Sequence, residues 1–180
     1  MGDEDPSALG KEGLEHYRMG EYVKALACFQ QAQQLFASQG DALAVGEMWN
    51  NIGVVHYRQQ RWAEAEAAFY EAQRIAANAR NKGGEGKALG NLGSLYARQG
   101  KNDLAEASLT QAIAIFREIG DQGKLEDTLK ALSDLKMKHG RWLEALYHYE
   151  SKLESNAQPT LWQRFQYSTI KLLKRLLHLP

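Results

Sequence analysis

The side chains best suited to acid-base or metal chemistry are those of Cys28 and five histidines: His16, His56, His139, His148 and His178. No histidine has a carboxylate or cysteine four residues after it, the spacing that places two metal ligands on one helix face. His16 and His56 stand 40 residues apart, and Tyr96 follows after another 40, which favours an aromatic-sized packing position. Cys28 lies among apolar residues, with Lys24 one helical turn before it, and is interpreted as a small buried hydrophobic side chain. We expect no catalytic residue, no metal site and no cofactor.

A stripe of basic and amide side chains has the chemistry of a binding surface. Residues spaced four, three and four apart project from one face of a helix. In this chain that spacing selects Lys11, Arg18, Glu47, Asn51, Arg58, Lys87, Asn91, Arg98 and Lys138. An amide both donates and accepts hydrogen bonds, as a peptide bond requires, and a guanidinium group suits a carboxylate. We predict a groove for an acidic or carboxylate-bearing peptide. The alternative is that each basic residue offsets the dipole at the end of its helix.

The stripe recurs because the chain repeats itself about every 40 residues. One series is Ala25, Ala65, Ala105 and Ala145, and another is Gly13, Gly53, Gly93 and Ser133. Apolar residues recur at three- and four-residue spacing, which predicts helices. A fixed period of this length indicates one helical unit copied four times and stacked. We therefore predict an all-α fold of four helix pairs followed by a C-terminal amphipathic helix.

The expected helices are 6–19 with 21–38, 41–59 with 62–79, 84–99 with 102–119, and 122–139 with 142–155, with a ninth helix after Pro159. Asp41, Asn81 and Asp121 suit helix N-caps. Gly40 and Gly120 suit the left-handed conformation that ends a helix. We expect an acidic tail at 1–5, repeats at about 6–40, 41–80, 81–120 and 121–155, and a basic segment at 156–180.

Two segments carry a family resemblance. Asn91-Leu92-Gly93-Ser94-Leu95-Tyr96 with Gly100, Ala105, Leu109 and Ala112 resembles the tetratricopeptide repeat, as does Asn51-Ile52-Gly53 with Trp62, Ala65, Phe69 and Ala72. The 40-residue period is similar to the longer repeats of kinesin light chains, LGN-type polarity adaptors and many bacterial regulators. The resemblance covers residues 6–155. It implies a right-handed α-solenoid that acts as a non-enzymatic adaptor or assembly factor and binds a peptide or protein partner on its concave face.

The terminal repeats depart from the family pattern. Glu12 stands at a usual Leu position, and Ser133 stands at a usual Gly position. Such departures are expected where a repeat has a neighbour on one side only. Gly10 and Leu14 stand where the carboxylate clamp of chaperone-binding relatives would supply Lys and Asn. The resemblance therefore does not imply binding of a chaperone tail.

The C-terminal segment has one apolar side and one basic side. Its candidate contact residues are Trp162, Arg164, Phe165, Lys171, Lys174 and Arg175. The first interpretation is a helix that caps repeat four. The alternative is a basic amphipathic helix on an anionic membrane surface or in the groove of a partner, because 156–180 holds no acidic residue. A membrane-surface scaffold or complex-assembly factor, with peripheral membrane contact through 160–180, is therefore the alternative function. A third is a small regulatory subunit that folds against a larger protein.

Charge and cysteine content narrow the remaining classes of function and of cellular location. Basic and acidic residues number 22 each, but four basic residues lie in 156–180, which leaves 18 against 22 in the first 155 residues. A net acidic array disfavours nucleic-acid binding. One cysteine excludes an internal disulfide, and no signal-like or membrane-spanning segment is evident, so we expect a cytoplasmic protein, with a peripheral membrane location as the alternative.

Overall fold

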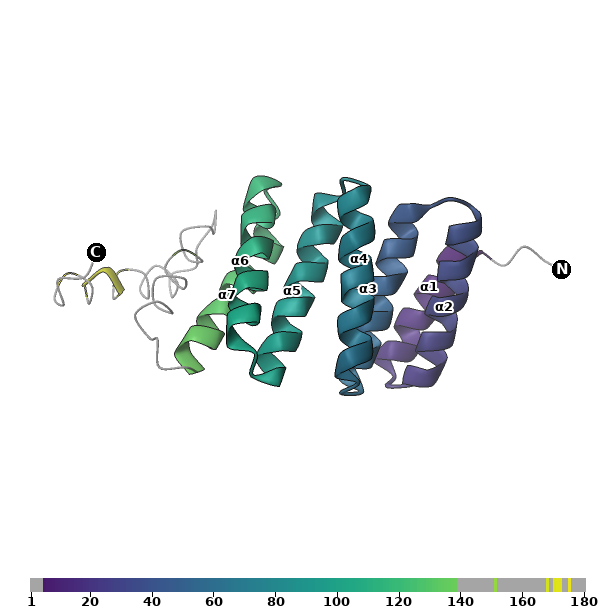
Figure 1. Cartoon of the computed structure of the whole chain (residues 1–180), viewed down its shortest axis with the longest axis horizontal. Coiled ribbons are helices and arrows are strands. Elements are labelled where there is room, and N and C mark those ends of the chain that lie inside the picture. Colours follow the sequence, from purple (N-terminus) through teal and green to yellow (C-terminus); the bar gives the residue numbers. More distant parts are fainter. Residues whose placement is uncertain (1–4, 139–150, 152–167, 169, 173–174, 176–180) are drawn as a thin grey trace.

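The computed structural model describes residues 5–138, 151, 168, 170–172 and 175, and residues 5–138 form seven consecutive helices (Figure 1). They are α1 (Pro6–Arg18), α2 (Tyr22–Ser38), α3 (Ala42–Arg58), α4 (Trp62–Asn78), α5 (Lys82–Gln99), α6 (Asn102–Glu118) and α7 (Gln122–Lys138). The predicted all-α solenoid is confirmed, with three complete helix pairs and the first helix of a fourth. The second helix of that pair, expected at 142–155, lies outside the described residues except at Ser151, which is helical. Residues 1–4 of the expected acidic tail at 1–5 also lie outside the described residues.

The turns recur every 20 residues and use one backbone conformation. The first residue after α5 and the second residue after each of α1, α2, α3, α4 and α6 have a positive φ; these residues are Gly20, Gly40, Gln60, Arg80, Gly100 and Gly120. The predicted left-handed glycines at 40 and 120 are confirmed, with φ of 75° and 72°. Gln60 and Arg80 adopt the same conformation, at φ of 60° and 54°, although their Cβ atoms disfavour it.

The predicted N-caps are also confirmed. Asp41, Asn81 and Asp121 each accept a hydrogen bond of 3.0 Å from the backbone N–H three residues later. The largest difference from the expected helix bounds is at α5, which begins at Lys82 rather than at 84. The Asn81 cap explains this difference, because its bond to the backbone N–H of Gly84 orders a first turn that contains Gly83 and Gly84.

Small residues let the two helices of a pair approach closely. Ala25, Ala65 and Ala105 are fully buried at the crossings. A Cβ atom at Gly53 would lie 2.6 Å from the Phe69 ring, and one at Gly13 would lie 2.6 Å from the Phe29 ring. No side chain fits at these glycines unless the aromatic ring moves. The Gly and Ala series therefore explain packing rather than binding.

The odd-numbered helices form one layer of the solenoid. Beyond the contacts between consecutive helices, α3 contacts α5, and α5 contacts α7. None of the described helices combines the length and the apolar character that crossing a membrane requires.

Candidate functional site

A pocket of about 510 Å³ lies where α3 and α5 meet the end of α4. Its charged and amide side chains are Asp41, Glu47, Asn50, Asn81, Lys87 and Lys124. Leu43 and Ile75 add apolar contact area, and the side chain of Leu43 is half exposed. The pocket therefore combines exposed apolar surface with charges of both signs.

A second pocket of about 200 Å³ lies between α5 and α7. It shares Lys87 and Lys124 with the first pocket and adds Asn91 and Asp127. Gly90 leaves room here, since no atom lies within 4 Å of the position that its Cβ would occupy. We call the two pockets together the concave groove.

Two polar contacts join α3 to α5 across the groove. The side-chain amide of Asn91 donates a 2.7 Å hydrogen bond to Oδ1 of Asn50, which is only 7% exposed. Lys87 Nζ lies 3.5 Å from Glu47 Oε1. Glu47, Lys87 and Asn91 are the members of the predicted stripe that line the groove.

The other predicted stripe residues lie outside the two pockets. Lys11, Arg18, Asn51, Arg58, Arg98 and Lys138 line neither of them. Arg18, Arg58 and Lys138 end their helices, and Arg98 lies in the last turn of α5. Arg58 Nε donates a 2.9 Å hydrogen bond to the Tyr17 hydroxyl, which raises the pKa of Arg58 and links repeat two to repeat one. We call Arg18, Arg58, Arg98 and Lys138 the basic row. The groove and helix-dipole interpretations of this basic row both stay predictions.

Asn50 and Lys124 are groove residues that the sequence analysis missed. The positions 40 residues from Asn50 hold Gly10 and Gly90, so no repeated residue type marks this position. The sequence feature that could have indicated Asn50 is a polar residue on an apolar helix face, with a second amide, that of Asn91, 41 residues later as its hydrogen-bond partner.

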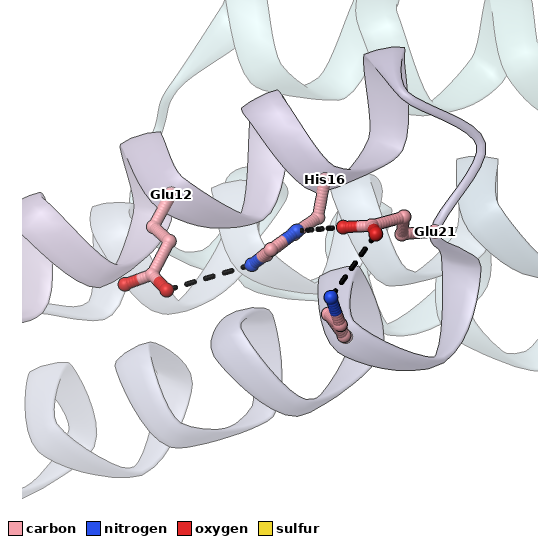
Figure 2. Close-up of polar contacts among 4 residues, drawn as sticks. Glu12, His16 and Glu21 are labelled. Atoms are coloured by element: carbon pink, nitrogen blue, oxygen red, sulfur yellow. Dashed lines mark hydrogen bonds and ion pairs between the residues drawn. The ribbon is translucent and has the colours of Figure 1, made fainter.

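A second polar cluster lies between α1 and α2 (Figure 2). His16 Nδ1 is 2.5 Å from Glu21 Oε2, and its Nε2 is 3.5 Å from Glu12 Oε1. One ligand atom each of Glu12, His16 and Cys28 lies within 4.8 Å of the others. The expectation of no metal site rested on the residues that follow each histidine, whereas Glu12 precedes His16 by one helical turn.

The charges in this cluster influence one another. The pKa of Glu21 is lowered by hydrogen bonds from Lys24 and from His16. The pKa of the Cys28 thiol is raised, first by burial and then by the Glu12 carboxylate. Cys28 is half-buried rather than fully buried, and it faces two polar residues. The expected role of a buried hydrophobic side chain therefore describes only part of its surroundings.

The candidate residues of the C-terminal segment are only partly described. Trp162, Arg164, Phe165 and Lys174 lie outside the described residues. Lys171 and Arg175 are helical and exposed, and Ile170 beside Lys171 is 6% exposed. Capping and membrane contact both stay predictions for this segment.

Comparisons with known proteins agree with the repeat architecture. No curated protein matches the chain in sequence. Among solved structures, BtubC (BKLC) from P. vanneervenii superposes with a TM-score of 0.75 at 19% identity, covering 89% of this chain and 70% of that one. Aspartyl phosphate phosphatase F from Bacillus subtilis gives 0.81 at 16% identity, covering 95% and 44%. The Rap conjugation gene regulator of plasmid pLS20, solved with the Phr* peptide, gives 0.66 at 15% identity, covering 92% and 52%.

The chain thus spans less than two thirds of the phosphatase and of the conjugation regulator. Similarity at these identities shows a shared fold. The sequence evidence is more direct, because a model of the tetratricopeptide repeat matches three overlapping stretches, 7–78, 44–118 and 84–155. Together these stretches span the helical array and extend beyond α7. The chain belongs to the tetratricopeptide repeat family.

Proposed function

We propose that this chain is a non-enzymatic protein-interaction module, an adaptor or assembly factor that binds an extended peptide or protein segment in the concave groove. The observation that carries the proposal is the pair of adjoining pockets along α5, which share Lys87 and Lys124. A segment that follows α5 can occupy both pockets at once.

The groove has suitable groups for peptide recognition. Asn91 uses one N–H on Asn50, which leaves its second N–H and its carbonyl oxygen to bond a peptide main chain. Lys87 and Lys124 favour a carboxylate between the pockets. Leu43 and Ile75 offer apolar surface for a side chain of the bound segment. These features favour a segment in which a carboxylate, placed beside the two lysines, lies close to an apolar residue.

A solved structure of the same fold supports a peptide as the occupant. The conjugation regulator of pLS20 was determined in complex with a peptide. Only the class of ligand is carried over to this chain, because the identity is 15%.

Selection from a random displayed peptide library, with the full chain immobilised, tests the proposal. We expect enrichment of acidic peptides, and the affinity of the best ones can be measured by fluorescence anisotropy. Asn91→Ala should weaken binding roughly fivefold to a hundredfold, because the peptide main chain would lose the hydrogen bonds that this amide makes to it. The double variant Lys87→Glu with Lys124→Glu should abolish binding.

The matched control for the double variant is Arg117→Glu with Lys130→Glu, which makes the same charge change at exposed positions outside both pockets. This control should bind like the wild type. Lack of enrichment, or equal losses in the groove and control variants, would contradict the proposal.

Reversing Arg58 and Arg98 to Glu then tests the basic row: binding should disappear if the row belongs to the groove, and should persist if it only offsets the helix dipoles. Circular dichroism confirms that each variant keeps its helical content.

A further inference from the structure

Repeat one carries a set of side chains that the other repeats lack at the same positions. Positions 12, 21 and 28 hold Glu12, Glu21 and Cys28, whereas the equivalents are Ile52, Arg61 and Ala68 in repeat two and Leu92, Lys101 and Ser108 in repeat three. An end repeat tolerates a charge at position 12, because the Glu12 side chain is 57% exposed. That tolerance does not explain why a carboxylate, an imidazole and a thiol converge there.

The imidazole of His16 is oriented as metal-binding histidines commonly are. With its ring proton on Nδ1, His16 donates to Glu21 across 2.5 Å, and the lone pair of Nε2 then faces Glu12 at 3.5 Å. Proteins often fix a metal-ligating histidine in this way, with a carboxylate holding the ring nitrogen that does not bind the metal. Lys24 in turn holds the other Glu21 oxygen at 3.0 Å. Glu21 is therefore positioned from both sides.

We propose that Glu12, His16 and Cys28 form a three-ligand site for a zinc-class divalent cation, with Glu21 as the positioning residue. A donor set of one sulfur, one nitrogen and one oxygen suits zinc and related transition metals rather than calcium or magnesium. Tetrahedral coordination at typical zinc distances separates ligand atoms by roughly 3.4–3.8 Å. The present spacing of up to 4.8 Å therefore requires only a small movement of half-exposed side chains.

Binding of the cation is accompanied by the loss of one proton from the cluster. The thiol of Cys28 releases its proton to solvent as the sulfur–metal bond forms, and no oxidation or reduction takes place. The two negative ligands then match the charge of the cation. Three protein ligands leave a fourth position for water or for a group from a binding partner. The site lies on α1 and α2, away from the residues that line the concave groove, so it does not depend on the proposed peptide binding.

Titration of the reduced full chain, without a polyhistidine tag, tests the proposal. Co²⁺ serves as the probe, because a thiolate ligand produces a charge-transfer absorption band, and competition by Zn²⁺ then gives the zinc affinity. The band should appear in the wild type and be absent in Cys28→Ser, which carries the residue of repeat three. Glu12→Gln and His16→Phe should each weaken zinc binding at least about tenfold, and Glu21→Gln about tenfold to a hundredfold.

The matched control is Glu15→Gln, a loss of the same charge at an exposed position of the same helix. It should bind zinc like the wild type. A further readout is the melting temperature, which should rise with Zn²⁺ in the wild type and in Glu15→Gln but not in Cys28→Ser. Absence of the charge-transfer band, or equal zinc affinities for Glu12→Gln and Glu15→Gln, would overturn the proposal.

Discussion

His16 and His56 occupy the same position in successive repeats, yet their surroundings differ. His56 is 9% exposed, and its Nδ1 has no hydrogen-bond partner among the described residues, so burial lowers its pKa. His16 is half-buried between two carboxylates. The backbone of the repeat determines where the side chain stands, whereas its neighbours determine what it can do.

The other two repeats support the same conclusion. In repeat three the position holds Tyr96, which donates a 2.9 Å hydrogen bond to Glu66 and lies 2.8 Å from the hydroxyl of Tyr70. In repeat four it holds Lys136, which is 3% exposed and pairs with Glu106. The expected aromatic-sized packing position is thus a more general slot, which accepts a long polar side chain when a neighbour provides its partner.

The largest difference in stability between repeats one and two should come from two separate variants, in which each repeat receives the other's residue at the position of Glu12 and Ile52. Ile52→Glu places a carboxylate where the native side chain is 3% exposed and should lower the free energy of unfolding by at least about 3 kcal/mol. Glu12→Ile, at a side chain that is 57% exposed, should change it by less than about 0.5 kcal/mol. Urea denaturation followed by circular dichroism measures both values. Similar losses in the two variants would show that the repeats do not differ in burial here.

Alanine substitutions at the packing glycines should destabilise repeats one and two by similar amounts. A Cβ atom would lie 2.6 Å from an aromatic ring at both Gly13 and Gly53, so each alanine variant should cost about 1–3 kcal/mol of unfolding free energy. Gly90→Ala is the control, since its Cβ meets no atom within 4 Å and alanine favours the helix by up to about 1 kcal/mol. Thermal denaturation compares the three variants. A neutral Gly53→Ala would mean that Phe69 moves aside at little cost.

The features that sequence predicted correctly depend on local chemistry. A cap such as Asp41 and a left-handed Gly40 act within a few residues, and the Gly53 position is marked by the repeat itself. Features that join different helices were missed. The Asn50–Asn91 bond depends on how α3 and α5 are rotated against each other, and the approach of Cys28 to His16 depends on how α1 packs on α2. Helical periodicity gives the face of each helix but not these relative rotations.

The buried His56 should make the free energy of unfolding depend on pH. Its folded pKa lies below the unfolded value of 6.5, so the unfolded chain binds the proton more readily. Stability contributed by the neutral ring is therefore complete above that value and is lost as the pH falls from it through the lower folded pKa. The melting temperature of the wild type should fall more between pH 7.5 and 5.5 than that of His56→Phe. Parallel curves for the two proteins would remove His56 as the cause.

The smallest expected contrast concerns the turns that end the first helices of the two repeats. Gly20 and Gln60 both adopt a positive φ, at 77° and 60°, but only Gly20 lacks the Cβ atom that disfavours this conformation. Gln60→Gly should stabilise the fold by about 0.5–1 kcal/mol, and Gly20→Ala should destabilise it by about 1 kcal/mol. Arg80→Gly is the matched control, because Arg80 also has a positive φ, at 54°, and should respond like Gln60. Chemical denaturation resolves shifts of this size. If Gln60→Gly instead lowered stability, its side chain would have to make contacts that outweigh the backbone strain.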